Sequence, residues 1–268
     1  MFRRVFQSVG KLTAGLASVQ IAATAVALTD KELSKKPDWY QNAVKAVESA
    51  VKDLSRKGFI ESRETLAHAE DALQRVLDLN NVEILWRYAR ILAEKAELSH
   101  CKHEKDELLH EAKKHIKKAL DIEPAAGISG LHKWAGIILT KLGELDKKNM
   151  DNESVKAHLK KATELDSQDA FAFYLYGVHL YKMKDYKEAA EAFKKAESIK
   201  KGFSPANKYY LGLALSELGK EKESIESLKE AMTLPSKFGF EGVAKSKAKG
   251  VLRTKFKFSE KEVEIKEY

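Results

Sequence analysis

The chain of 268 residues is poor in residues that break helices or form crosslinks, with 4 prolines, 14 glycines and 1 cysteine. A single cysteine excludes an internal disulfide and any zinc site built on cysteine pairs, and it favours a reducing compartment. The scarcity of glycine and proline argues against a β-sandwich, a barrel or a collagen-like fibre. Because 44% of the residues are apolar, the chain can bury a core. We therefore expect an all-α fold.

Motifs of catalysis are also missing. The glycine-containing stretch 127–130 matches neither a phosphate-binding loop nor a nucleophile elbow. Four of the eight histidines lie near Cys101, namely His100, His103, His110 and His115. No second cysteine or carboxylate completes a convincing metal set there, and a solvated insertion is the better interpretation. The sequence thus predicts no enzyme, no catalytic residue, no metal site and no cofactor.

The net charge of +8 is unevenly distributed. Residues 1–29 contain three basic and no acidic side chains, and residues 236–258 contain seven basic side chains against Glu241, whereas the body of the chain is nearly neutral. An acidic partner would be attracted to these basic ends. The basic patch consists of Lys245, Lys247, Lys249, Arg253, Lys255 and Lys257. A capping helix with a solvated basic face is the alternative for this segment, and we expect no nucleic-acid partner.

Residues 1–29 differ in composition from the rest, since hydroxyl residues and alanine replace lysine and glutamate. The uncharged stretch 12–28 is short and only weakly apolar for a membrane span. Its composition suits a mitochondrial presequence or an organelle anchor, and a secretory signal or an untargeted N-terminal arm also remains open. We treat residues 1–29 as a separate targeting, anchoring or flexible segment with possible membrane contact.

The body of the chain repeats one helical pattern. A small residue is followed four positions later by a large apolar residue and three positions after that by another small or apolar one. The pattern occurs at 69–76, 112–119, 155–162, 189–196 and 224–231, with steps of 43, 43, 34 and 35 residues. Small residues let a helix approach its neighbour closely, while the large residue fills the space between pairs. Paired-helix repeats have a period of 34 residues.

The pattern closely resembles the tetratricopeptide repeat. Residues 170–203 and 205–235 match it nearly position by position, with Gly177 and Gly212 at the close contact between paired helices. The earlier pairs carry insertions near 100–107 and 144–152, which we expect between their helices. The predicted fold class is therefore an all-α α-solenoid of antiparallel helix pairs, with a repeat domain at 30–235 and a basic capping helix and tail at 236–268.

A narrower resemblance, to the regulator of microtubule dynamics family, is carried by the strings 83–90 and 131–136 and extends over about 80–235. Arg90 departs from the repeat, which prefers glycine there, and we expect this to loosen one helix contact. The resemblance implies association with microtubules and spindle poles, and for some members a membrane-attached N-terminus. Tubulin carries acidic tails, so the basic patch is the expected contact.

The first helices of the pairs are expected to line a concave groove. The inward-facing positions hold Arg87, Lys133, Tyr174 and Tyr209, and one turn further on Ile91, Ile137, Val178 and Leu213. This predicts an aliphatic groove with a basic end for a protein or a lipid, unless the chain's own C-terminal helix fills it.

The function predicted from these observations is that of a non-enzymatic repeat protein. It would bind tubulin, microtubules or a microtubule-associated protein in spindle organisation and chromosome segregation, in the cytoplasm and on the cytoskeleton. The alternative is a membrane-attached tether or a lipid-binding protein, with mitochondrial localisation at the outer membrane or after import.

Overall fold

The computed structural model describes residues 34–35, 37–55 and 58–263. All regular secondary structure in these ranges is helical, which confirms the predicted all-α class. The chain divides into two compact units on either side of the Met150–Asp151 bond. We call them unit 1 and unit 2 and describe each by itself. The predicted segment 1–29 lies outside the described residues.

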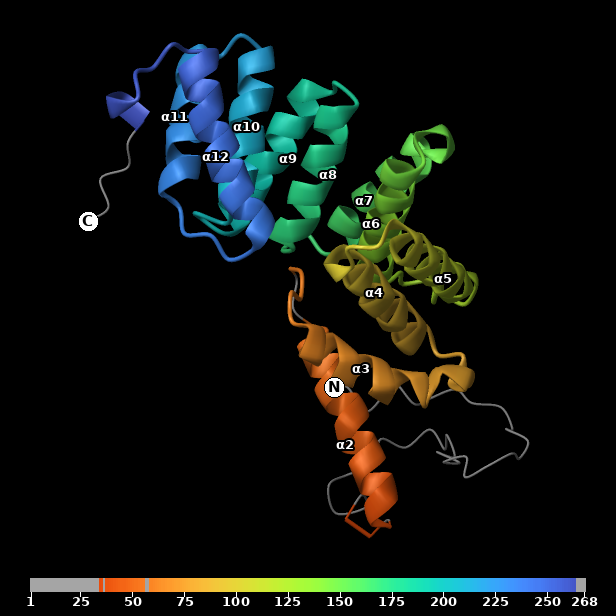
Figure 1. The fold of residues 1–268 in the computed structure, drawn as a ribbon. Helices are drawn as coiled ribbons and strands as arrows, with labels where there is room; N and C mark the ends of the chain where they lie inside the picture. Colours follow the sequence, from red (N-terminus) through yellow and green to blue (C-terminus); the bar gives the residue numbers. More distant parts are fainter. Residues whose placement is uncertain (1–33, 36, 56–57, 264–268) are drawn as a thin grey trace. The chain divides into compact units, whose positions relative to one another are not determined.

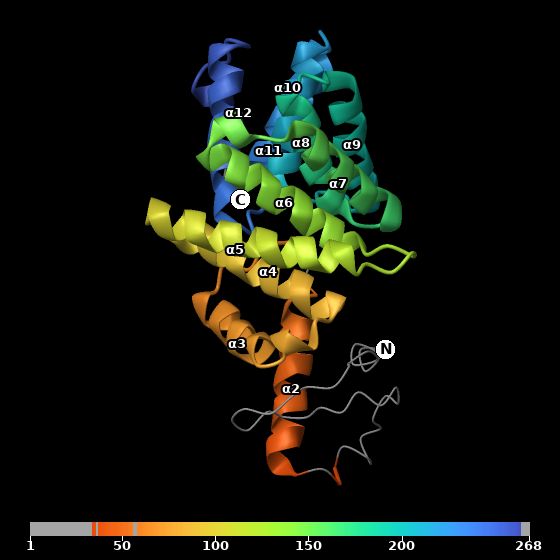
Figure 2. The ribbon, with the colours of Figure 1, turned by 90° about the vertical axis from the view of Figure 1, so that its right-hand side faces the viewer.

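Unit 1 consists of helices that pack in sequential order (Figures 1 and 2). Its elements are α2 (Asp38–Asp53), α3 (Arg63–Gln74), η2 (Leu77–Leu79), α4 (Val82–Leu98), α5 (Lys102–Asp121), α6 (Ser129–Leu145) and η3 (Lys147–Asn149). The helices α2 and α3 pack together, α4 packs with α5, and α6 contacts both α4 and α5. Figure 2 shows α4 and α5 lying side by side.

Unit 2 contains the most regular pairs. Its elements are α7 (Asn152–Leu165), α8 (Ala170–Lys182), α9 (Tyr186–Ile199), α10 (Pro205–Glu217), α11 (Glu221–Thr233), α12 (Gly239–Thr254) and η4 (Lys261–Val263). The pairs α8/α9 and α10/α11 are antiparallel hairpins, and α10 also packs against α9. Side-chain caps start several of these helices: Asp169 accepts hydrogen bonds from the N–H groups of Phe171 and Ala172 at the start of α8.

The two glycines of the repeat pattern lie where the paired helices touch. A Cβ atom on Gly177 would lie 2.6 Å from the Phe193 ring, and one on Gly212 would lie 2.7 Å from Leu228. The contact thus leaves no space for a larger residue at either position. In both pairs the large residue of the second helix fills the space that glycine provides on the first, as the pattern predicts.

Helix α12 continues the array by lying alongside α10 in the same direction. At the start of α12, Glu241 accepts a 2.5 Å hydrogen bond from Ser204, the N-cap residue of α10. Near its end, Lys255 pairs with Glu217 at 3.3 Å. Apolar side chains of α11 and α12 form a cluster that the buried Val263 of η4 completes. The last described turn of the chain therefore packs into the core of unit 2.

The insertion near 100–107 was predicted as a segment between helices, and this is wrong. Only residues 99–101 connect α4 to α5, and α5 begins at Lys102 and runs for 20 residues. The Lys/Glu-rich sequence has high helix propensity, so the extra residues lengthen the helix instead of forming a loop. His103 and His110 therefore lie on α5. The insertion near 144–152 does contain a connection, with η3 between α6 and α7.

No helix in the described part of the chain has the length and apolar character needed to cross a bilayer.

Candidate partner-binding faces and the basic helix

The predicted groove residues of unit 1 lie on α4 and α6, which contact each other. Ile91 has no exposed surface and Ile137 is also buried, so both belong to the interior and do not form the floor of a groove. Arg87 and Lys133, the basic residues of this half, are buried as well. The structure thus places all four in the packing between helices.

In unit 2 the predicted positions lie on α8 and α10. Tyr174 is buried, whereas Val178, Tyr209 and Leu213 are half-buried and contribute to the surface of this face. Tyr210 joins the set, since its ring centroid lies 6.4 Å from that of Tyr174 and 5.1 Å from that of Tyr209. The face is therefore more aromatic than the aliphatic groove expected from the sequence. A groove continuous over both halves stays a prediction.

The turn into α12 also reaches this aromatic face. The Phe240 ring stacks on Tyr174 with centroids 6.3 Å apart, and Phe238 stacks on Phe240 at 5.6 Å. Burial raises the pKa of Tyr174 far above its ordinary value, so its hydroxyl stays neutral. Helix α12 itself packs on α10 and α11, and it is its first turn that touches α8. The sequence analysis did not identify these two phenylalanines. The available signal was that Phe238 and Phe240 stand on either side of Gly239.

A buried ion pair on α4 ties the preceding segment of unit 1 to this helix. Arg90 is 2% exposed and pairs with the equally buried Glu94 at 3.3 Å. The Arg90 guanidinium also donates to the carbonyl oxygens of Leu54, just after α2, and of Gly58, the latter at 2.9 Å. Glu94 accepts a 2.9 Å hydrogen bond from the Ile60 N–H. Arginine at the glycine position therefore makes a tertiary contact and does not loosen the packing, contrary to our expectation.

The pair is also buried against an aromatic ring. The Arg90 guanidinium lies 4.9 Å from the centroid of the Trp134 ring of α6. Burial raises the pKa of Glu94, and the adjacent Arg90 charge partly offsets that effect. A buried site can hold two opposite charges that pair and make several hydrogen bonds, whereas either charge alone would be too costly in free energy to bury there.

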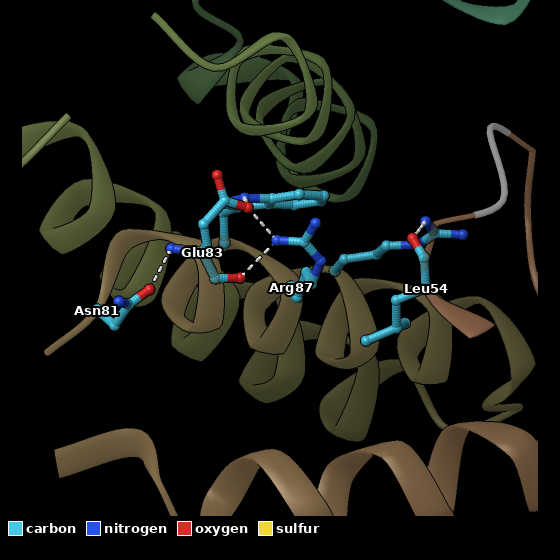
Figure 3. A network of polar contacts seen from close by, with 6 residues as sticks. Leu54, Asn81, Glu83 and Arg87 are labelled. Atoms are coloured by element: carbon cyan, nitrogen blue, oxygen red, sulfur yellow. Dashed lines mark hydrogen bonds and ion pairs between the residues drawn. The ribbon is translucent and has the colours of Figure 1, made fainter. Parts of the chain in front are cut away.

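Arg87 forms a second network one turn earlier on α4. Its Nη1 donates to the Glu83 carboxylate and, at 2.8 Å, to the Glu83 carbonyl oxygen. Figure 3 shows both bonds, with Asn81 capping the start of the helix. Glu83 also accepts a 3.0 Å hydrogen bond from the Trp86 indole. The first two turns of α4 thus form a polar cluster in which Arg87 is held against the Glu83 carboxylate.

The predicted basic patch lies on α12 and the turn that follows it. Lys247, Arg253, Lys255 and Lys257 are exposed, whereas Lys245 and Lys249 are half-buried. Several of these groups contact the chain itself. Lys245 donates to the Leu234 carbonyl oxygen at 2.9 Å, and Arg253 pairs with Glu260 at 3.4 Å. Within the described residues, Lys247 and Lys257 make no ion pair, so they are the most available cations of the patch.

Comparison with known proteins gives two kinds of relative. Regulator of microtubule dynamics protein 1 of Mus musculus is 30% identical over 178 residues, which cover 58% of this chain and 58% of that protein. Regulator of microtubule dynamics protein 3 of Rattus norvegicus is 27% identical over 177 residues, covering 58% of this chain and 37% of that protein. The chain therefore matches about half, or less, of the length of these relatives.

The structural relatives are helical-repeat proteins. The crystal structure of YrrB, a TPR protein with an unusual peptide-binding site, has a TM-score of 0.51 at 20% identity and covers 76% of this chain and 92% of its own. A thermophilic TPR protein of Thermus thermophilus, TTC0263, has a TM-score of 0.52 at 16% identity, covering 77% and 98%. At these identities the likeness concerns the fold, and it confirms the tetratricopeptide-like α-solenoid class.

The profile of the family "Regulator of microtubule dynamics protein 1-3" matches residues 49–186 and 184–257. The match takes in both units, including α12 and its basic residues. Because it covers most of the chain, the protein belongs to the regulator of microtubule dynamics family, as its sequence had indicated.

Proposed function

We propose that this protein is a non-enzymatic helical-repeat adaptor that binds microtubules or a microtubule-associated protein. It acts in spindle organisation and chromosome segregation, in the cytoplasm and on the cytoskeleton. The observation that carries the proposal is family membership together with a tetratricopeptide-like fold. Folds of this kind present helix faces to protein partners.

The basic residues of α12 supply the attraction in this mechanism. Acidic tubulin tails would meet a helix whose exposed face carries Lys247, Arg253 and Lys255. Exposed charges act mainly on the rate of encounter and are screened by salt, so binding should weaken as ionic strength rises. The half-buried residues Tyr209 and Leu213 of the aromatic face supply the area for partner specificity.

Buried ionisable groups support a non-enzymatic role, because their contacts hold helices together. Arg90 and Glu94 fix the segment after α2 to α4, and Glu241 joins the starts of α10 and α12. Tyr176 donates a 2.6 Å hydrogen bond to Glu188, which links α8 to α9. Each of these groups has a packing role that accounts for its position.

Microtubule co-sedimentation of the purified chain tests the proposal. The test variant replaces Lys247, Arg253, Lys255 and Lys257 by alanine. The control variant replaces four exposed lysines of α5, namely Lys102, Lys113, Lys117 and Lys118. Both variants lose four positive charges, so only the site differs. We expect the test variant to bind about tenfold more weakly and the control to bind within about twofold of the unaltered chain. Equal losses would show that net charge alone acts, and full binding by the test variant would exclude α12 from the mechanism.

A further inference from the structure

The chain reverses direction directly after α12. Lys257 has a φ of 60°, the left-handed conformation in which many helices end. The Phe258 N–H donates a 3.1 Å hydrogen bond to the Leu252 carbonyl oxygen and so closes the end of the helix. The following residues turn back, and η4 contacts α12 (Figure 1). We call residues 256–263 the return segment.

Apolar contacts hold the return segment on unit 2. Val263 is 2% exposed and belongs to the cluster formed by α11 and α12, and Phe258 packs against the same cluster. The Lys229 ammonium of α11 lies 4.5 Å from the centroid of the Phe258 ring. Within the segment, the Ser259 N–H and hydroxyl both donate to the Glu262 carboxylate, at 2.8 and 2.6 Å. The segment therefore has a defined place against α11 and α12.

This place brings an acidic group onto the basic patch. The Glu260 carboxylate lies 3.4 Å from the Arg253 guanidinium and 4.0 Å from the Lys249 ammonium. Because Lys249 and Arg253 are four positions apart on α12, they share one face of the helix. Lys255 pairs with Glu217 of α10. Three of the six cations of the basic patch are therefore paired within the chain itself.

The charge contacts of the return segment are exposed and reversible. The side chains of Arg253 and Glu260 are 47% and 60% exposed, and an ion pair in that setting contributes little free energy. Glu260 competes with external anions mainly because the chain tethers it, which gives it a high local concentration. A partner segment with several carboxylates can displace it, and the exposed Lys247 is available for the first contact.

We propose that the return segment is an autoinhibitory clamp, in which Glu260 occupies the place on α12 that a carboxylate of the acidic partner takes in the complex. The inference rests on the proposed function and deepens it, since it names what regulates the basic patch. Because the partner must release the segment before it can use the whole patch, any change that loosens the segment should raise the affinity.

Microtubule co-sedimentation of the full chain at low salt tests the charges of the clamp. The test variant combines Glu260→Gln with Glu262→Gln. The control variant combines Glu191→Gln with Glu226→Gln, at exposed positions of α9 and α11. Both variants lose two negative charges. We expect the test variant to bind about threefold to fivefold more tightly and the control to change by less than about 1.5-fold. Equal gains would show that net charge alone acts and would overturn the clamp.

A second variant tests the anchor without altering any charge. Val263→Ala loosens the buried contact of the return segment, and Val243→Ala makes the same change at an exposed valine of α12. We expect Val263→Ala to bind microtubules about twofold or more tightly than the unaltered chain, because the segment is released more often. An affinity no higher than that of Val243→Ala would count against the clamp.

Hydrogen exchange of the unaltered chain follows the segment directly. The Phe258 N–H bonds to the Leu252 carbonyl oxygen, and the Val263 N–H bonds to that of Glu260 at 3.2 Å. Both amides should exchange at least about fivefold faster with saturating microtubules than in the free chain. Unchanged or slower exchange in the bound state would show that the segment stays in place and would overturn the proposal.

A probe without tubulin separates this inference from the proposed function. Fluorescence anisotropy with labelled decaglutamate, amidated at its C-terminus, measures access of carboxylates to α12. If the chain does not bind microtubules, the proposed function fails, and tighter decaglutamate binding by the Glu260→Gln, Glu262→Gln variant than by the unaltered chain would still support the clamp. Equal binding, or none by either chain, would overturn it. Microtubule binding that no clamp variant changes would refute the clamp alone.

Discussion

At the scale of single residues, Arg90 shows where a repeat consensus misleads. The consensus favours glycine at this position because the next helix approaches closely. Here the side chain instead extends to the carbonyl oxygens after α2 and to Glu94. Sequence alone could not reveal this, because the partners Leu54 and Gly58 lie more than 30 positions away and are backbone atoms. The identity of the residue was informative, but its role depended on tertiary packing.

Replacing Arg90 by alanine should destabilise the chain by about 3–5 kcal/mol, because Glu94 would remain buried without its partner. The combined change Arg90→Met and Glu94→Leu should recover most of that loss, since no charge is then buried. Urea unfolding followed by circular dichroism measures both. Arg75→Ala, at an exposed pair, is the control and should change stability by less than about 0.5 kcal/mol. A loss for Arg90→Ala as small as that of the control would contradict a structural role for the pair.

Two buried histidines predict how stability depends on pH. Burial lowers the pKa of His115 and of His179 below 6.5, the ordinary value. The unfolded chain therefore binds protons at a higher pH than the folded chain, and the free energy of unfolding should fall as the pH drops through 6.5. Replacing both residues by glutamine should flatten this dependence, whereas His103→Gln on the exposed part of α5 should leave it intact. An unchanged slope in the double variant would rule out these two groups as its source.

At the scale of helices, the small-residue pattern predicted the packing of unit 2. Gly177 and Gly212 were identified from spacing alone, and each contacts the large residue expected from the pattern. Helix ends were harder to predict. The extra residues near 100–107 extend α5. They have high helix propensity, but charged side chains are found both in loops and on exposed helix faces, so the sequence did not distinguish the two. The contact of Phe240 with Tyr174 also escaped prediction, since it joins α8 to a helix outside the matched repeats.

The tight contact between α8 and α9 gives a direct test of the pairing. Gly177→Ala should destabilise the chain by about 1–3 kcal/mol, because the added methyl group overlaps the Phe193 ring. Phe193→Leu in the same chain should relieve part of the clash. The substitution Gly250→Ala, where a Cβ atom meets nothing within 4 Å, is the matched control and should be neutral or stabilising. Equal effects of the two alanines in urea unfolding would argue that helix propensity decides and not the contact.

At the scale of the whole molecule, the sequence predicted the fold class and the family better than the site. A repeat pattern depends on local spacing, which can be read directly from the sequence, and the five copies of the pattern support the same interpretation. Whether a predicted groove residue is exposed depends on how its helix is rotated about its own axis relative to the neighbouring helix. That is why Ile91 and Ile137 lie in the interior while Tyr209 reaches the surface. The charges of α12 were visible in the sequence, but their pairing with Glu217 and Glu260 required the fold.

The proposed function requires that this chain bind microtubules through electrostatic attraction to acidic tubulin tails. The most direct measurement compares the affinity of the unaltered chain for intact microtubules and for microtubules whose tails have been removed by subtilisin, at low and at physiological salt. We expect tail removal to weaken binding about tenfold or more at low salt, with a smaller difference at higher salt. The same affinity for both kinds of microtubule, independent of salt, would contradict the account.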